Sequence, residues 1–166
     1  MTKIIDFSAL ATDLNQLKAT TLAKVGEHDA NHIRRMIRWQ RVFEFSGRAL
    51  LMLGFWQPIL WLVGVLSLAL GKILDNMEIG HNIMHGQYDW MNDPVINSRQ
   101  FEWDLACDGE SWKRVHNYEH HTYTNILGKD RDFGYGLLHL CDDLKWRVNN
   151  LWQFITYINL SLLFQW

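Results

Sequence analysis

Residues 49–71 spell ALLMLGFWQPILWLVGVLSLALG, a run of 23 residues without one charged side chain. Arg48 and Lys72 bound this run, and His81 follows soon after it. A helix needs about 20 apolar residues to cross the hydrocarbon core of a bilayer. A chain of 166 residues could hardly enclose so long an apolar helix on every side. The run therefore predicts an all-α integral membrane protein.

Pro58 divides the apolar zone, whose wider limits are residues 42–79. As one helix this zone would be about 57 Å long, far more than the bilayer core requires. Either one span continues into an emergent helix, or Trp56-Gln57-Pro58 turns a helical hairpin. Basic residues crowd both flanks of the zone, namely Arg34, Arg35, Arg38 and Arg41 before it and Arg99, Lys113, Arg114, Lys129 and Arg131 after it. Because cytoplasmic flanks are typically basic, this pattern favours the hairpin.

The rest of the chain divides by composition. Residues 1–31 form a polar N-terminal arm, with a modest helix expected from Ser8 to Val25. Residues 32–43 are basic and amphipathic, which is typical of a helix at a membrane surface. Residues 80–150 are expected on the cytoplasmic side, and the charge-free run 151–166 is expected to begin a further membrane helix. We therefore expect a main domain at 32–166, with membrane segments at about 42–79 and 151–166.

Charge and cysteine content limit the possible partners and compartments. The net charge is −2, and no basic tract indicates a nucleic-acid partner. Cys107 and Cys141 are isolated, which argues against a disulfide framework and fits a reducing compartment.

Five of the eight histidines lie in two clusters after the apolar run. The first cluster, His81 and His85, has i, i+4 spacing, which places both rings on one face of a helix. The second repeats that spacing at His116 and His120 and adds His121. A doubled histidine fits a dinuclear centre better than a single tetrahedral zinc site. Imidazole binds zinc, copper and iron, so the ligand type alone does not name the metal.

Two acidic residues precede the first cluster on the same helical approach. Asp75 and Glu78 are candidates for hydrogen-bond partners that orient the imidazole of His81. The alternative, equally weighted, is that these carboxylates only mark the cytoplasmic end of the helix.

The two clusters and their surroundings resemble a known family. Residues 75–86, DNMEIGHNIMHG, and residues 112–125, WKRVHNYEHHTYTN, resemble the first two of the three histidine boxes of membrane fatty acid desaturases, particularly bacterial ones. The resemblance covers roughly residues 34–166.

This resemblance implies a non-haem di-iron centre on the cytoplasmic side of the membrane. The family pattern makes the iron ligands His81, His85, His116, His120 and His121. The implied reaction uses O2 and two electrons to insert a double bond into a fatty acyl chain, carried as acyl-CoA or acyl-lipid. The implied electron donor is ferredoxin, cytochrome b5 or an NAD(P)H-dependent reductase.

The sequence departs from the family pattern at the third box. His139 stands without a second histidine beside it, and His28 and His32 match no box. Members of the family are longer, so we expect this chain to be a truncated form, inactive alone. A related hydroxylase and a non-catalytic membrane or metal-binding remnant remain alternatives. A soluble di-iron carboxylate bundle is disfavoured, because only one Glu-x-x-His motif, Glu78 to His81, occurs where two are needed.

Other residues near the clusters have less specific roles. The aromatic side chains that could line an acyl channel, or simply pack, are Tyr88, Trp90, Trp103, Trp112 and Tyr118. Asn117 and Asn125 flank the second cluster and could hydrogen-bond a ligand or a metal-bound water.

Overall fold

The computed structural model describes residues 7–103, 105 and 107–163. The chain divides into two compact units, residues 1–35 and residues 36–166. The described residues form helices and no strands, which confirms the all-α prediction. The first unit holds α1, Phe7–Leu22, and the beginning of α2, Glu27–Leu53. No residue of α1 is buried.

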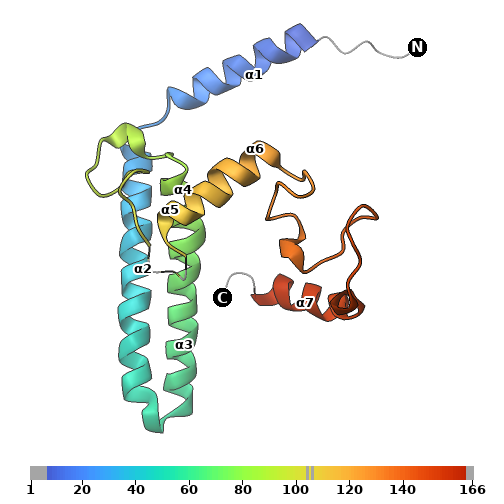
Figure 1. The fold of residues 1–166 in the computed structure, drawn as a ribbon. Coiled ribbons are helices and arrows are strands. Elements are labelled where there is room, and N and C mark those ends of the chain that lie inside the picture. The colour runs from blue at the N-terminus through green and yellow to red at the C-terminus, as the bar shows by residue number, and fades with distance from the viewer. Residues whose placement is uncertain (1–6, 104, 106, 164–166) are drawn as a thin grey trace. The chain divides into compact units, whose positions relative to one another are not determined.

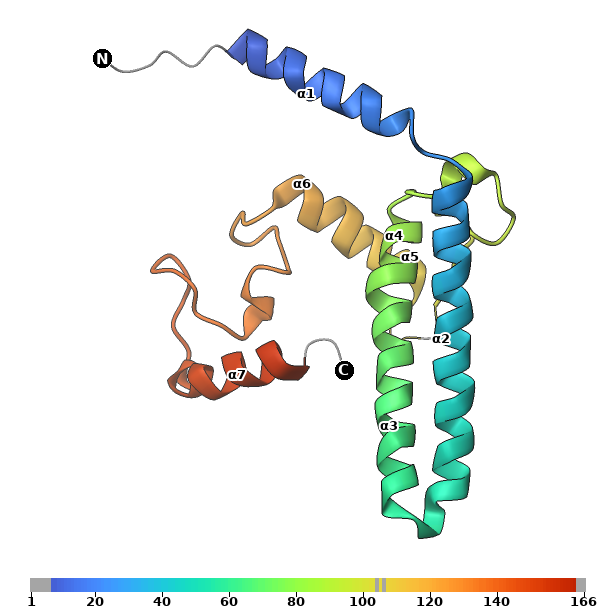
Figure 2. The ribbon, with the colours of Figure 1, turned by 180° about the vertical axis from the view of Figure 1, so that it is seen from behind.

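In the second unit α2 lies beside α3, Pro58–Ile73 (Figure 1, Figure 2). Between them Gly54–Trp56 form the short 3-10 helix η1, and Gln57 is extended. Pro58 then occupies the first turn of α3, where its missing N–H costs no helical hydrogen bond. Close approaches pair Gly54 with Trp61 and Gly47 with Leu68, so the two helices run in opposite directions.

Small residues let α2 and α3 approach closely. A Cβ atom at Gly47 would lie 2.7 Å from Cγ of Leu68, and one at Gly64 would lie 3.0 Å from the backbone nitrogen of Leu51. Ser67 Oγ donates to the carbonyl oxygen of Phe43 at 2.7 Å and lies 3.0 Å from Ser46 Oγ. Small residues and interhelical hydroxyl bonds are typical of helices that pack within a membrane.

The helix that begins at Pro58 continues without a break to Met84, through the π-helix η2, Leu74–Gly80, and α4, His81–Met84. In the described residues this 27-residue helix is the one long and apolar enough to cross a membrane. Only 22% of the most apolar 18-residue stretch of this helix is buried inside the protein, whereas the core helix of a soluble protein would be mostly buried. The structure thus has one candidate span, which begins inside the apolar zone 42–79 and extends beyond it to Met84.

A second composite helix carries the other histidine cluster. It consists of α5, Gly109–Trp112, the π-helix η4, Lys113–His120, and α6, His121–Tyr123. Asp108 caps its start, because its Oδ1 accepts the backbone N–H of Ser111 at 2.8 Å. The remaining elements of the described chain are η3 Asp89–Met91, η5 Gly134–Gly136, η6 Val148–Trp152 and α7 Gln153–Leu163. The predicted apolar segment 151–166 thus forms the end of η6 and α7, and residues 164–166 lie outside the described part.

Candidate metal centre

The two histidine clusters come together at the start of α4 and along η4 and α6. Contacting pairs of the five rings have centroids 4.6–5.3 Å apart. His81 contacts both His85 and His116, and His85 also contacts His121. All five histidines singled out from the sequence therefore meet at one place, although they come from separate helices.

The donor atoms fit a metal ion. One nitrogen each of His81, His85 and His116 lie within 4.8 Å of one another. Two nitrogens that bind one first-row metal ion at about 2.1 Å are at most about 4.2 Å apart, so a set within 4.8 Å is close to what one ion requires. His116 and His120 form a second compact group with Asp132.

Ring packing holds the histidines in place. Trp112 stacks on His116 with centroids 4.5 Å apart and also touches the rings of His81 and His85. Trp103 in turn packs edge-on against Trp112, and its indole lies directly over Gly80. Gly80 is the residue before His81, and a side chain there would collide with that indole. Trp103 and Trp112 thus build one wall of the site.

The other aromatic candidates lie in different surroundings. Tyr88 is buried, whereas Trp90 and Tyr118 are largely exposed. The role of these residues in an acyl channel stays a prediction.

Asn117 links the two clusters. Its Nδ2 donates to the backbone carbonyl oxygen of Met84 at 2.8 Å, which ties η4 to the last turn before His85. Its Oδ1 is buried and has no hydrogen-bond partner in the described residues. A buried acceptor without a donor suggests that a water or ligand completes this position. The backbone N–H of Asn125 donates to Asp130 at 2.7 Å, and the role of its side chain stays a prediction.

Two aspartates that the sequence analysis missed lie against the second cluster. Asp130 contacts Nδ1 of His120 at 3.0 Å, and Asp132 contacts Nδ1 of His116 at 3.2 Å. The segment 127–136 is rich in charged residues, and it buries Asp130. The available signal was the Asp-x-Asp spacing shortly after the second cluster, in a loop with Asn125 and Gly128 as turn residues.

The acidic residues chosen from the sequence, Asp75 and Glu78, lie on η2, just before His81. Asp75 is buried and lines a cavity of about 400 Å³ between α2, η2 and the loop 94–103. The backbone carbonyl oxygen of Glu78 accepts Nδ2 of Asn82 at 2.9 Å. Their predicted part in orienting His81 stays a prediction.

Burial shapes the protonation of the rings. Desolvation, followed by the nearby His81, His116 and His121, lowers the pKa of His85 to about 4. Desolvation also lowers the pKa of His116, although Asp132 opposes this change. Both rings are therefore neutral near pH 7, as a metal ligand must be.

Two of the remaining histidines, His32 and His139, have hydrogen-bond contacts outside this cluster. His139 Nε2 lies 2.9 Å from the carbonyl oxygen of Leu144, and its backbone N–H donates to Gln153 Oε1. Nδ1 of His32 lies 3.5 Å from the guanidinium of Arg35.

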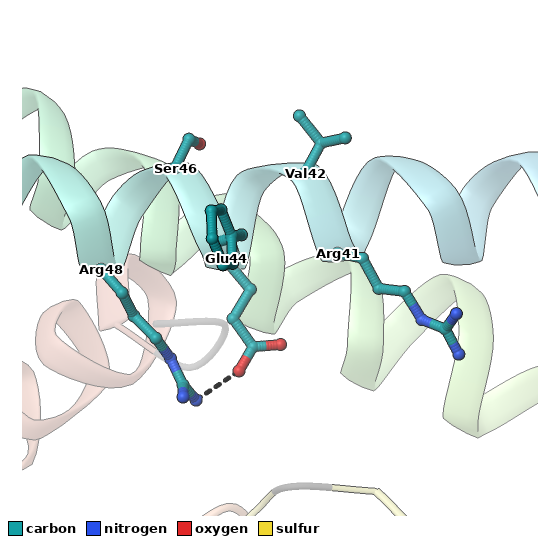
Figure 3. A pocket seen from close by; sticks show the side chains of 6 residues that line it. Arg41, Val42, Glu44, Ser46 and Arg48 are labelled. Carbon is teal, nitrogen blue, oxygen red and sulfur yellow. Dashed lines mark hydrogen bonds and ion pairs between the residues drawn. The ribbon is translucent and has the colours of Figure 1, made fainter.

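A hollow along α2 is a different feature. It has a volume of about 680 Å³ and runs along α2, lined by Arg41, Val42, Glu44, Phe45, Ser46 and Arg48 (Figure 3). Arg48 pairs with Glu44 across it. No histidine lines this hollow, so it is separate from the metal centre.

Comparison with known proteins agrees with the site. The chain is 45% identical over 161 residues to proteins named NADPH-dependent stearoyl-CoA 9-desaturase from two strains of Mycobacterium tuberculosis, CDC 1551 and H37Rv. It is 30% identical over 120 residues to the sn-1 linoleoyl-lipid 6-desaturase of Arthrospira platensis. These matches cover 97% and 68% of this chain, respectively.

The matched regions are only part of the relatives. The chain spans 38% of the length of the mycobacterial proteins and 32% of the Arthrospira protein. No protein-family model matches the chain, and no solved structure matches it. The resemblance predicted from the two histidine clusters is nevertheless confirmed: along nearly its whole length, this chain is a relative of the fatty acid desaturases.

Proposed function

We propose that the chain supplies part of the catalytic centre of a membrane fatty acyl desaturase that contains a non-haem di-iron site. The observation that carries this proposal is the convergence of five imidazoles from two helices, with contacting rings 4.6–5.3 Å apart. The relatives named as desaturases supply the reaction class.

Iron fits the proposed chemistry because it can change oxidation state and accepts imidazole ligands. Reduction of O2 to two waters takes four electrons. Two come from the C–H bonds that are lost when the double bond forms, and an external donor must supply the other two. Bound iron would supply the O2 chemistry, while the five histidines hold it and Trp112 covers one side of their rings.

The number of ligands bears on activity. Five imidazoles provide fewer than three nitrogens for each of two irons. We therefore propose that desaturation requires further ligands, and that the 166-residue chain alone is inactive.

The substrate and electron donor follow from the relatives. The mycobacterial proteins are named as acting on stearoyl-CoA with NADPH, and the Arthrospira protein as acting on a lipid-bound acyl chain. The higher identity to the former favours an acyl-CoA substrate and an NADPH-dependent reductase. An acyl-lipid substrate and a ferredoxin or cytochrome b5 donor are the alternatives.

We also propose that α2 and α3 form a membrane hairpin with the metal centre on the cytoplasmic side. The exposed apolar surface of α3 and of the last turns of α2 supports this proposal, because Met52, Leu53 and Ile59 are each more than 70% exposed. The hollow in Figure 3 lies where this surface begins and combines apolar Val42 and Phe45 with Arg41 and Arg48. Arginine beside apolar side chains suits the level of the lipid head groups.

The test is metal analysis of the purified chain in detergent after loading with Fe(II). We expect bound iron in the unaltered chain, and at least a tenfold loss of affinity in His85→Ala and in His120→Ala. His139→Ala is the matched control and should bind normally, since its ring bonds to Leu144. Equal iron binding by all four chains would overturn the ligand assignment.

Activity is tested in a full-length protein that contains this segment. Analysis of the acyl products separates desaturation from the hydroxylase alternative, because one gives an alkene and the other an alcohol. Activity that persists in the His120→Ala variant of that protein would refute the proposal.

A further inference from the structure

We propose that Asp130 and Asp132 are positioning residues that keep His120 and His116 in the tautomer with the proton on Nδ1, so that Nε2 of each ring is free for metal. The choice of tautomer concerns the metal-free chain. That Nε2 of each ring then binds metal rests on the proposed function.

Asp130 is a preformed acceptor. Its side chain has no exposed surface, and its two oxygens lie 3.0 and 3.1 Å from Nδ1 of His120. The same oxygens accept the backbone N–H groups of Asn125, at 2.7 Å, and of Asp132, at 2.9 Å. Because both oxygens accept backbone N–H groups, neither is placed to carry a proton, and the side chain is an acceptor. An ionised carboxylate only accepts hydrogen bonds, so Nδ1 of His120 must be the donor.

Asp132 holds the neighbouring ring in the same way. Its Oδ2 lies 3.2 Å from Nδ1 of His116 and 3.7 Å from Nδ1 of His120. The two rings are nearly parallel, with centroids 5.1 Å apart and an angle of 23° between their planes. Their Nδ1 edges therefore face the aspartates together. In a neutral ring with a proton on Nδ1, the lone pair lies on Nε2.

The loop is anchored so that these carboxylates stay in place. Arg131 Nε pairs with Glu119 at 3.0 Å, and Lys129 Nζ lies 4.7 Å from the centroid of the Tyr123 ring. Lys129 and Arg131 thus contact the helix that carries the second cluster, while Asp130 and Asp132 hydrogen-bond to its histidines. Asn125 has a φ of 61°, a left-handed conformation that asparagine tolerates better than most residues.

Direct metal binding by Asp132 is the competing explanation, since Asp132, His116 and His120 form a compact donor group. If Nδ1 of His120, which lies 3.7 Å from Asp132 Oδ2, were the ligand in this group, its lone pair would have to face the metal. That nitrogen already faces both oxygens of Asp130, and a lone pair there would repel them. The hydrogen-bonded arrangement is therefore favoured.

The test is to observe the histidine tautomers by NMR in the metal-free chain, labelled with ¹⁵N-histidine, near pH 7.5. Two-bond ¹⁵N–¹H correlations distinguish a proton on Nδ1 from one on Nε2. His116→Gln and His120→Gln variants assign the signals. We expect both rings to carry the proton on Nδ1. A proton on Nε2 in either ring of the unaltered chain overturns the proposal for that residue.

Variants separate positioning from ligation. Asp132→Asn keeps an acceptor oxygen and should retain the His116 tautomer, with iron affinity reduced less than tenfold. Asp132→Ala should lose the tautomer and reduce iron affinity about 10–100-fold, the usual effect of losing such a partner. Asp130→Asn provides the corresponding conservative change at the buried site, and the exposed Asp142→Ala is the control.

Loss of iron in Asp132→Asn with an unchanged tautomer would show direct ligation and overturn the positioning role. If the unaltered chain binds no iron but shows both Nδ1 protons, the proposed function fails while the tautomer assignment stands. The NMR result is obtained without metal, so the two failures are distinguishable.

Discussion

His85 and His116 combine a lowered pKa with a place among the candidate metal ligands. Desolvation and the adjacent imidazoles lower the pKa of His85 to about 4, and desolvation lowers that of His116 despite Asp132. In an unfolded chain both would titrate near 6.5. Folding therefore favours the neutral form of both rings, and metal meets less competition from protons.

This arrangement predicts acid sensitivity of the metal-free chain. A lowered pKa in the folded state gives stability that is present above about pH 6.5 and lost as the pH falls toward 4. We expect the thermal unfolding midpoint in detergent to decrease as the pH is lowered from 7 to 4.5. His85→Gln should flatten this dependence, and the same change at exposed His28 should not. An unchanged slope in His85→Gln would contradict the assignment.

The five candidate ligands were predictable from the sequence because their spacing is local, whereas the aspartates were not. His120 and Asp130 are brought together by the turn around Asn125 and Gly128, and two backbone N–H groups stabilise the Asp130 carboxylate. Charged residues in a loop ordinarily predict exposure. The burial of Asp130 depends on this tertiary arrangement, which neither hydropathy nor spacing reveals.

At the level of elements, both histidine-bearing helices contain π-helical segments. Leu74–Gly80 ends just before His81, and Lys113–His120 includes His116 and His120. Such segments are rare and are frequent at functional sites. The sequence predicted ordinary α-helical spacing, because the shift to i→i+5 hydrogen bonds leaves no residue signature. The histidine rings nevertheless lie together, as the i, i+4 spacing led us to expect.

The packing of α2 on α3 gives a second prediction. Gly47→Val should lower the free energy of unfolding by about 1–3 kcal/mol, because its Cβ would lie 2.7 Å from Cγ and 2.9 Å from the backbone nitrogen of Leu68. The control is Gly26→Val, where no atom lies within 4 Å of an added Cβ. Unfolding in mixed detergent, followed by circular dichroism, measures both. Equal stability of the two variants would show that α2 and α3 are not packed as described.

At the scale of the molecule, the sequence predicted the helical class, the apolar zone in which the candidate span begins, and the relation to desaturases. These features depend on composition and on local motifs, which a single sequence contains. The loop 124–133 and the tryptophan wall depend on contacts between segments. Trp103 meets Gly80 and Trp112, residues separated from it along the chain, and no periodicity predicts that meeting.

The membrane arrangement can be tested through sidedness. The helix Pro58–Met84 is 27 residues long, or about 40 Å at 1.5 Å per residue, enough to cross a core of about 30 Å and extend beyond it. If α2 and α3 form a membrane hairpin, η1 lies on the side opposite the histidines. We expect an impermeant maleimide to label exposed Cys107 only from the cytoplasmic side, in a Cys141→Ser background. Phe55→Cys, made in a chain that also carries Cys107→Ser, should be labelled only from the other side, because Phe55 is 75% exposed within η1. Labelling of both positions from one side would contradict a hairpin that crosses the membrane. It would also remove the support for placing the metal centre on the cytoplasmic side of the bilayer.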